Sequence, residues 1–296
     1  MVFVRFFRPM ALKSVFPPLF LTLLLALSCC ASAPDSPVLP LRYPVILVNG
    51  LSIRDGEGAG SWGKIPAFLR RQGIDLYFGG TDAWGRIETN AEFLKQRVEE
   101  ALRETGKERV NIIAHSAGGI TARYMIWNYG MGARVASLTT LCTPHQGSEL
   151  ADFVYTRKIT HRPLIKNLFE RIGKSQGDQR PAPYELGFAL TTGEMRKFNA
   201  EVVPDPQVYY LSIYTTIDSF GDDPRYGLTR RYLDRAAGPN DGIVSAESTR
   251  WHGERISAGE GISHLEILDH RRRSTDAETI INIYTEILKR LVDHGF

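Results

Sequence analysis

The stretch that decides the fold is VNIIAHSAGG, which runs from Val110 to Gly119. A run of apolar, β-forming residues leads into a turn of small residues around Ser116, and a helix-like sequence follows. This order is typical of a nucleophile elbow, in which a strand, a sharp turn and a helix hold a serine in a strained backbone conformation. Only small residues fit two positions away on either side, and here these are Ala114 and Gly118. The pattern predicts that Ser116 lies at the carboxyl end of a strand and the positive end of a helix.

Short apolar runs alternate with amphipathic segments along the rest of the chain. Besides the run before Ser116, the predicted strands are residues 43–48, 74–78, 135–142 and 208–213. The predicted helices are residues 62–71, 90–106, 117–129 and 275–291. This alternation predicts an α/β fold with a mainly parallel central sheet flanked by helices. Such sheets bind ligands at the carboxyl ends of their strands, which is the predicted position of Ser116.

The alternation stops between Ala151 and about Pro206, a stretch too long for a simple loop. We expect an inserted segment with structure of its own. Five apolar residues in it have helical spacing: Leu164, Ile165, Leu168, Phe169 and Ile172. They indicate either a helix packed permanently on the core, or a lid whose apolar face covers the site and opens at a lipid surface.

Residues 1–33 have the composition of an export signal. Arg5, Arg8 and Lys13 precede a short apolar run, and small residues follow it. The run is short and interrupted by prolines, which disfavours a membrane span, and a retained N-terminal anchor is the alternative. We therefore expect an exported protein that is secreted, periplasmic or lipid-anchored to the cell envelope.

Two processing sites are compatible with this leader. The sequence ASA at residues 31–33 suits a signal peptidase, although a proline directly after it is unfavourable. The sequence LSC at residues 27–29 resembles the signal of bacterial lipoproteins, in which the cysteine is lipidated, and Cys29 is followed by Cys30. In that case the proline-rich stretch after the leader would be a tether.

The formal net charge of +3 resides in the leader, which holds three basic residues and no acidic ones. Residues 34–296 are formally neutral and long enough for one large catalytic domain. Nothing in this balance indicates nucleic-acid binding. Cys142 is the only cysteine beyond the leader, which excludes a disulfide framework and favours a small buried hydrophobe.

A serine nucleophile needs a histidine base and an acid that orients it. In proteins with a nucleophile elbow, these three residues follow one another along the chain in the order serine, acid, histidine. The histidines are His115, His145, His161, His252, His264, His270 and His294. His264 is favoured because it follows a possible strand, RISAGEGIS, and can lie on a loop at the edge of the sheet. His145 and His161 come too early in the chain, and His294 lies near its frayed end.

Asp241 is the favoured acid. It lies in the turn-forming sequence PNDG at residues 239–242, where backbone N–H groups can orient a carboxylate toward an imidazole. A plain Asp-Gly turn is the alternative interpretation. The rival acids are Asp218, Asp222, Asp223 and Asp234.

An oxyanion hole needs two backbone N–H groups. One is expected from Ala117, directly after the nucleophile. The other is expected from Leu51, in the loop after the first strand, where Gly50 lets the backbone approach a substrate closely.

Six sequence blocks occur in one order between residue 43 and about residue 270: YPVILVNGL, VNIIAHSAGGITARY, LTTLCTPHQGSELADF, LTTGEMRKFN, PNDGIVS and ISHLEILDH. Together they resemble the secreted bacterial triacylglycerol lipases of the pseudomonad type. The resemblance implies an α/β-hydrolase fold with Ser116 as nucleophile, Asp241 as acid and His264 as base. It also implies a helical lid in the insertion after residue 148.

The same resemblance implies Leu51 and Ala117 as the oxyanion donors. The chain departs from the family pattern at Asn49, where a histidine is usual, and at Ala114, where a glycine is usual. The missing histidine is not a proton carrier in the family, and alanine is small enough for the elbow.

Many relatives hold one structural calcium ion. The matching positions here are Asp223, in an Asp-Pro pair upstream of the predicted acid, and Glu266, two residues after His264. Carboxylates are hard oxygen ligands of the kind calcium prefers, although glutamate is one methylene longer than the usual aspartate. Two unconnected surface acids are the alternative. Several relatives also have a disulfide, for which this chain lacks the cysteines.

The sequence thus predicts an exported serine hydrolase that cleaves carboxylic esters, with acylglycerols at a lipid–water interface as the expected substrates. It would need no redox cofactor. An esterase, a phospholipase or an acyltransferase of the same fold is the first alternative. A non-catalytic, lipid-binding envelope lipoprotein is the second. The sequence identifies no folding chaperone.

Overall fold

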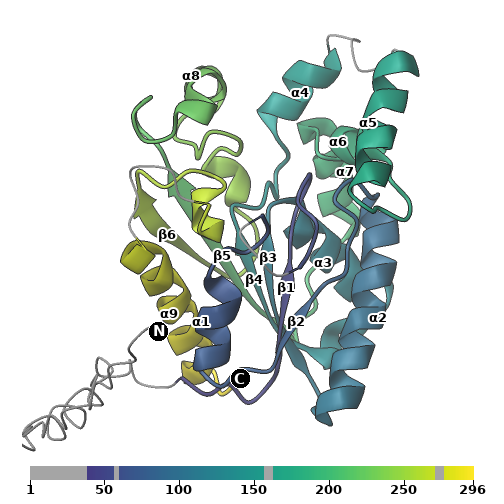
Figure 1. The fold of residues 1–296 in the computed structure, drawn as a ribbon, viewed down its shortest axis with the longest axis vertical. Coiled ribbons are helices and arrows are strands. Elements are labelled where there is room, and N and C mark those ends of the chain that lie inside the picture. Colours follow the sequence, from purple (N-terminus) through teal and green to yellow (C-terminus); the bar gives the residue numbers. More distant parts are fainter. Residues whose placement is uncertain (1–38, 57–59, 157–162, 271–276) are drawn as a thin grey trace, which may run out of the picture. The chain divides into compact units, whose positions relative to one another are not determined.

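The computed structural model describes residues 39–56, 60–156, 163–270 and 277–296. The predicted export leader, residues 1–33, lies outside them. In the described residues, a six-stranded sheet has the order β2-β1-β3-β4-β5-β6, and every pairing in it is parallel (Figure 1). The strands are β1 (Val45–Val48), β2 (Leu76–Phe78), β3 (Val110–His115), β4 (Val135–Leu141), β5 (Tyr209–Thr216) and β6 (Glu254–Glu260).

Helices connect these strands and cap their ends. The α-helices of the described residues are α1 (Ile65–Arg71), α2 (Ile87–Thr105), α3 (Ala117–Asn128), α4 (Glu149–Thr156), α5 (Pro163–Ser175), α6 (Pro183–Ala189), α7 (Thr192–Glu201), α8 (Gly227–Ala236) and α9 (Ala277–Asp293). Short 3₁₀ helices are η1 (Met131–Arg134), η3 (Pro224–Tyr226), η4 (Glu247–Thr249) and η5 (Glu266–Leu268). The predicted α/β fold is confirmed, including the helix expected from the apolar spacing at residues 164–172.

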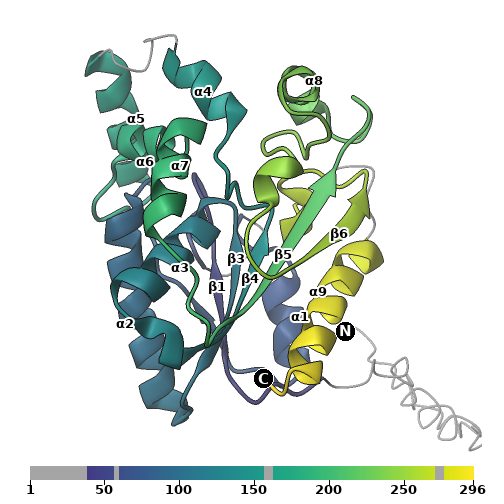
Figure 2. The same ribbon diagram turned by 180° about the vertical axis from the view of Figure 1, so that it is seen from behind.

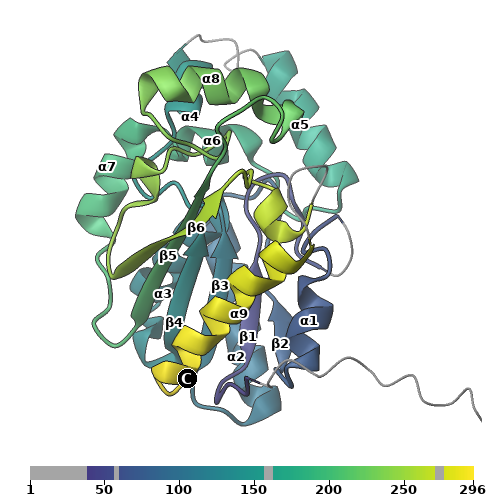
Figure 3. The ribbon, with the colours of Figure 1, turned by 90° about the vertical axis from the view of Figure 1, so that its left-hand side faces the viewer.

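The strands β1, β3 and β4 are buried on both faces of the sheet. Successive strand residues point to opposite sides, so each of these strands contributes side chains to both faces. In β1, Val45 and Leu47 belong to the apolar cluster that contains residues of α1 and α9. Ile46 and Val48 belong to the cluster formed with α2 and α3 on the other side. Figures 2 and 3 show these two helix pairs on opposite faces of the sheet.

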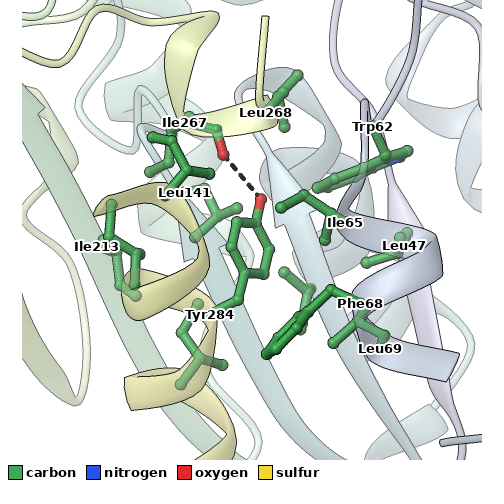
Figure 4. Packing of buried hydrophobic residues seen from close by; sticks show 14 of the residues in the cluster. Leu47, Trp62, Ile65, Phe68, Leu69, Leu141, Ile213, Ile267, Leu268 and Tyr284 are labelled. Carbon is green, nitrogen blue, oxygen red and sulfur yellow. Dashed lines mark hydrogen bonds between the residues drawn. The ribbon is translucent and has the colours of Figure 1, made fainter. Parts of the chain in front are cut away.

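A buried tyrosine ties the C-terminal helix to the loop after β6. The Tyr284 hydroxyl of α9 donates a hydrogen bond of 3.0 Å to the carbonyl oxygen of Ile267 in η5, among the apolar side chains drawn in Figure 4. A buried hydroxyl without a partner would be costly, so this bond fixes the loop against the core. The loop is the one that carries His264.

The inserted segment supplies α4 to α7, which gather with α8 beyond the carboxyl ends of the strands (Figure 1). Leu186, Leu190 and Met195 pack against Ile120 of α3, which joins α6 and α7 to the main domain. The predicted apolar face of α5 lies outside the described side chains apart from Ile172. No described helix combines the length and the apolar character needed to cross a membrane.

Candidate active site

Ser116 lies in the sharp turn between β3 and α3, with φ 53° and ψ −130°. A non-glycine residue adopts such a conformation only when its surroundings enforce it. Its N–H donates to the carbonyl oxygen of Leu141 on β4, and its own carbonyl accepts from Thr143 Oγ1, both at 2.9 Å. Gly118 is required because a Cβ there would lie 2.7 Å from the carbonyl oxygen of Val48. The neighbouring strands therefore hold the predicted elbow in its strained form.

Ser116, His264 and Asp241 come together at the carboxyl edge of the sheet. His264 Nε2 lies 3.0 Å from Ser116 Oγ, and His264 Nδ1 lies 2.7 Å from Asp241 Oδ2. All three residues are buried, with exposed fractions of 8%, 5% and 1% respectively. A carboxylate at Nδ1 favours the tautomer that leaves Nε2 free to accept the serine proton.

The turn predicted at residues 239–242 fixes the Asp241 carboxylate. Its Oδ1 accepts hydrogen bonds from the backbone N–H groups of Ile243 (2.9 Å) and Val244 (2.7 Å). The His264 backbone N–H donates to the Asp241 carbonyl oxygen at 3.0 Å, which joins the two loops directly. One carboxyl oxygen is thereby anchored while the other faces the imidazole.

His115, the residue before Ser116, contacts both the backbone and the ring of His264. Its Nε2 lies 2.9 Å from the His264 carbonyl oxygen, and the two rings are 4.6 Å apart. A carbonyl can only accept, so Nε2 carries the proton. Burial, together with the nearby His264, lowers the pKa of His115 well below its usual range. His115 is therefore a neutral donor that fixes the backbone of His264.

The loop after β1 passes close to the nucleophile. A Cβ on Gly50 would lie 2.7 Å from Ser116 Cβ and 2.9 Å from the Ala117 nitrogen, so only glycine permits this approach. Ala117 begins α3, and its N–H is among the first four of a helix, which have no acceptor inside the helix. The Leu51 N–H has no hydrogen-bond acceptor among the described residues. Both predicted oxyanion donors thus lie beside Ser116 on segments that contact each other.

Asp55 anchors the start of this loop. Its Oδ1 accepts the backbone N–H of Asn49 at 2.6 Å, and its Oδ2 accepts the Thr81 hydroxyl at 3.0 Å. Burial raises the pKa of Asp55 to about 6, although these hydrogen bonds act in the opposite direction. Asn49, which stands where the family usually has histidine, donates from Nδ2 to Ser61 Oγ at 2.6 Å.

The end of the loop is anchored from the inserted segment. The Ser52 N–H donates to the Ala83 carbonyl at 2.8 Å. The N–H groups of Ala83 and Trp84 each donate to the Asp178 carboxylate at 2.9 Å. In return the Asp82 carboxylate accepts the N–H groups of residues 179 and 180. The inserted segment therefore helps to hold the loop after β1 in place.

An apolar cavity of about 410 Å³ opens onto Ser116 and His264. The loop after β1, α4, α6 and the turn after Asp241 supply most of its walls. Apolar and aromatic side chains predominate among the lining residues, which include Leu51, Trp84, Pro144, Leu150, Val154, Tyr155, Tyr184, Leu190, Val244 and Leu265. The volume and lining are those of a small-molecule site with an apolar ligand.

A family model described as alpha/beta hydrolase fold matches residues 44–160. A triacylglycerol lipase of Vibrio cholerae is 38% identical over 284 residues, which cover 84% of this chain and 88% of that protein. The chain belongs to the bacterial triacylglycerol lipase family. A triacylglycerol lipase of Pseudomonas fragi is 26% identical over 288 residues, 86% of this chain and 97% of that protein. The crystal structure of Staphylococcus hyicus lipase superposes with a TM-score of 0.66 at 17% identity over 89% of this chain and 99% of that one, which shows the fold.

As a member of the triacylglycerol lipase family with the α/β-hydrolase fold, the chain is a serine hydrolase of carboxylic esters. Lipases of this fold generally need no cofactor. The closer assignment to the pseudomonad type stays a prediction.

The predicted calcium ligands Asp223 and Glu266 are both fully buried and meet at Ser263. Ser263 Oγ donates to Asp223 Oδ2 at 2.7 Å, and its N–H donates to Glu266 Oε2 at 3.0 Å. The Arg225 guanidinium, however, binds both oxygens of Asp223. Calcium needs six to eight oxygen ligands. A calcium ion cannot bind the two carboxyl oxygens of Asp223 while the Arg225 guanidinium occupies them. The side chains present therefore do not fit a calcium ion.

Cys142 is buried, as predicted, but its position was not anticipated. Its sulfur lies 3.4 Å from Thr215 Oγ1, and it forms a group with Asp241 and His264 whose potential ligand atoms lie within 4.8 Å of one another. Burial raises the pKa of the Cys142 thiol well above its usual range. The carboxylate and imidazole of this group already bind each other, so it is a hydrogen-bonded relay with a protonated thiol beside it.

Sequence reasoning missed the residues that hold the site in place: Asp55, Asp82, His115, Asp178 and Arg225. His115 could have been suspected from its place next to Ser116. Asp178 lies 95 residues from Ala83 along the chain and left no local signal. Arg225 left a weak one, since a basic residue follows the Asp-Pro pair directly.

Proposed function

We propose that this protein hydrolyses acylglycerols through a catalytic triad of Ser116, His264 and Asp241. The observation that carries the proposal is the continuous chain from Ser116 Oγ through the imidazole to Asp241, with distances of 3.0 Å and 2.7 Å. Histidine and carboxylate in this relation to a serine activate it as a nucleophile.

In the first half of the reaction, Ser116 Oγ attacks the ester carbonyl carbon while His264 Nε2 takes the serine proton. Asp241 stabilises the imidazolium that forms. The N–H groups of Leu51 and Ala117 donate to the oxyanion, where charge develops. The carbon–oxygen bond to the alcohol then breaks, and His264 returns the proton to the leaving alkoxide.

The second half hydrolyses the acyl-enzyme. A water molecule gives a proton to His264 Nε2 and attacks the acyl carbon. Collapse of the tetrahedral intermediate releases the fatty acid and returns the proton to Ser116 Oγ. No step needs a redox cofactor, and none is routed through calcium.

An acyl chain as the ligand of the cavity is supported by its apolar lining beside Ser116. Residues of α4 and α6 form part of its wall, which supports the lid interpretation of the segment 151–206. In this proposal the lid opens at a lipid–water interface, which gives emulsified esters an advantage over dissolved ones. Export, with the leader 1–33 removed or lipidated, completes the proposal, and the mass of the mature N-terminus tests it.

The test is a chain-length series of p-nitrophenyl esters on wild type and Ser116→Ala. We expect the substitution to lower kcat/KM by at least about a thousandfold, as for loss of a triad nucleophile. Rates on tributyrin, triolein and phospholipid, each dissolved and emulsified where solubility allows, separate a lipase from an esterase or a phospholipase. Fluorophosphonate should label wild type and leave Ser116→Ala unlabelled. An active Ser116→Ala protein would refute the triad.

A further inference from the structure

Asp223 is a fully buried carboxylate that receives four contacts from one residue, Arg225. Arg225 Nε lies 2.9 Å from Oδ1 and 3.0 Å from Oδ2, Arg225 Nη2 lies 2.5 Å from Oδ2, and the Arg225 backbone N–H donates to Oδ1 at 3.1 Å. Burial alone would raise the pKa of Asp223, but the hydrogen bonds from Arg225 and Ser263 outweigh it and lower that pKa. The ion pair is therefore charged and geometrically fixed, unlike a solvent-exposed pair.

This ion pair reaches the loop that carries His264 on both sides of the imidazole. On one side, Ser263 donates its hydroxyl to Asp223 and its N–H to Glu266. On the other, Arg225 Nη2 lies 3.3 Å from the carbonyl oxygen of His270. The loop from residue 263 to residue 270 is thus attached at both of its ends to the turn at residues 223–225.

We propose that the Arg225 guanidinium takes, within the chain itself, the place of a divalent cation between Asp223 and the loop of the catalytic histidine. The acceptors are those that a cation would use, a buried carboxylate and a backbone carbonyl, and the negative charge of Glu266 lies nearby. Arg225 brings a positive charge to them from two residues away, and the intervening Pro224 restricts the backbone of the turn. Its planar fork binds two carboxyl oxygens together, which a lysine cannot do.

A tethered cation has consequences that a bound ion does not. It cannot dissociate or be removed by a chelator, and its local concentration does not depend on the medium. Arg225 would then be a positioning residue for His264, with the effect on catalysis transmitted through Ser263. That effect rests on the proposed triad, whereas the response to calcium does not.

The experiment compares wild type, Arg225→Ala and Arg225→Lys, each with EDTA and with millimolar CaCl₂. Arg250→Ala is the matched control, since Arg250 also forms a two-pronged pair with a nearby carboxylate, Glu247, but on an exposed surface away from this loop. The measurements are the thermal midpoint, calcium binding by calorimetry, and kcat and KM on a soluble p-nitrophenyl ester.

Wild type and Arg250→Ala should not bind calcium. The thermal midpoint of each should be the same with EDTA as with CaCl₂. Arg225→Ala should lose roughly tenfold in kcat with little change in KM, and calcium should bind to it and raise its thermal midpoint by about 3 °C. Arg225→Lys retains a cation, so it should stay indifferent to calcium, with a midpoint between those of wild type and Arg225→Ala.

Calcium binding by wild type, or a lower wild-type midpoint in EDTA, would overturn the proposal. So would an Arg225→Ala protein that matches wild type, or one that is impaired but does not respond to calcium. If Arg225→Ala does not fold in either medium, Arg225→Lys decides: a thermal midpoint that calcium leaves unchanged supports the proposal, and one that rises with calcium overturns it. If wild type lacks esterase activity, the proposed function fails, while the calorimetric and thermal measurements still decide this inference.

Discussion

The two sides of the catalytic centre are held in place by carboxylates in contrasting electrostatic settings. On the oxyanion side, Asp55 and Asp178 accept backbone N–H groups, and burial raises the pKa of both. On the side of the base, Asp223 is bound by the Arg225 guanidinium and its pKa is lowered. The same functional group thus anchors both sides, but of these three carboxylates only Asp223 has a guanidinium on both carboxyl oxygens.

This difference determines how each side responds to pH and to the loss of a cation. N–H dipoles only partly compensate a buried carboxylate for lost hydration, so protonation begins at a higher pH. At Asp223 the Arg225 guanidinium, together with the Ser263 hydroxyl, outweighs the lost hydration and keeps the carboxylate charged into the acid range. The carboxylates on the oxyanion side should therefore take up protons at a higher pH than Asp223, and the side of the base should depend on its cation instead.

The largest effect within this comparison is expected from breaking the oxyanion side with Gly50→Ala. The new methyl group would lie 2.7 Å from Ser116 Cβ and 2.9 Å from the Ala117 nitrogen, so the loop must move away from the nucleophile. Loss of an aligned oxyanion donor should lower kcat by about a hundred- to a thousandfold. Kinetics on a p-nitrophenyl ester, with circular dichroism to verify folding, measure this.

Gly56→Ala is the matched control, because a Cβ at residue 56 meets nothing within 4 Å. It should retain the activity of wild type. A fully active Gly50→Ala enzyme would show that the loop after β1 does not supply the oxyanion hole.

An intermediate effect is expected from pH. The pKa of Asp55 rises from its ordinary value of 3.8 to about 6 on folding, so between these values the folded protein binds a proton that the unfolded chain does not. The contribution of Asp55 to the free energy of unfolding is therefore fully present below pH 3.8 and is lost as the pH rises through about 6. Asp223, with its lowered pKa, contributes stability above its ordinary pKa that is lost only in stronger acid.

Urea unfolding of wild type and Asp55→Asn between pH 4 and pH 7 tests this difference. The free energy of unfolding of wild type relative to Asp55→Asn should fall as the pH rises through this window, because asparagine does not titrate. Asp75→Asn, a change at an exposed carboxylate, should run parallel to wild type. Parallel curves for wild type and Asp55→Asn would contradict the raised pKa.

The smallest effect is expected on the side of the base, from Tyr284→Phe. The substitution removes the 3.0 Å hydrogen bond to Ile267 and leaves a buried carbonyl oxygen without that donor (Figure 4). We expect the free energy of unfolding to fall by about 1 kcal/mol while kcat changes less than about twofold, because Arg225 and Ser263 still hold the loop. Chemical denaturation and ester kinetics measure the two quantities.

Tyr129→Phe is the control, since the Tyr129 hydroxyl has no hydrogen-bond partner among the described residues. It should change neither quantity. A large loss of kcat in Tyr284→Phe would show that α9, rather than the Arg225 ion pair, is what positions the base.

The alternation of strands and helices could be predicted from the sequence because it depends on local patterns. The apolar runs that form β1, β3 and β4 are buried on both faces, and the amphipathic segments that form α2 and α9 are helices with one apolar face. Ser116 was identified by its small neighbours, and Asp241 by a turn whose own N–H groups bind it. His264 needed the chain order as well, because 148 residues separate it from Ser116.

The arrangements that only the tertiary structure decided involve groups far apart in sequence. Nothing near Asp178 indicates that it binds the N–H groups of Ala83 and Trp84, since polar residues on loops are common and their partners are set by packing. For Arg225, the sequence determines one feature and the tertiary structure another. Its place beside Asp223 was visible in the sequence, but whether the acidic pair holds a metal ion or a guanidinium depends on where that side chain points after folding, because two carboxylates attract either cation.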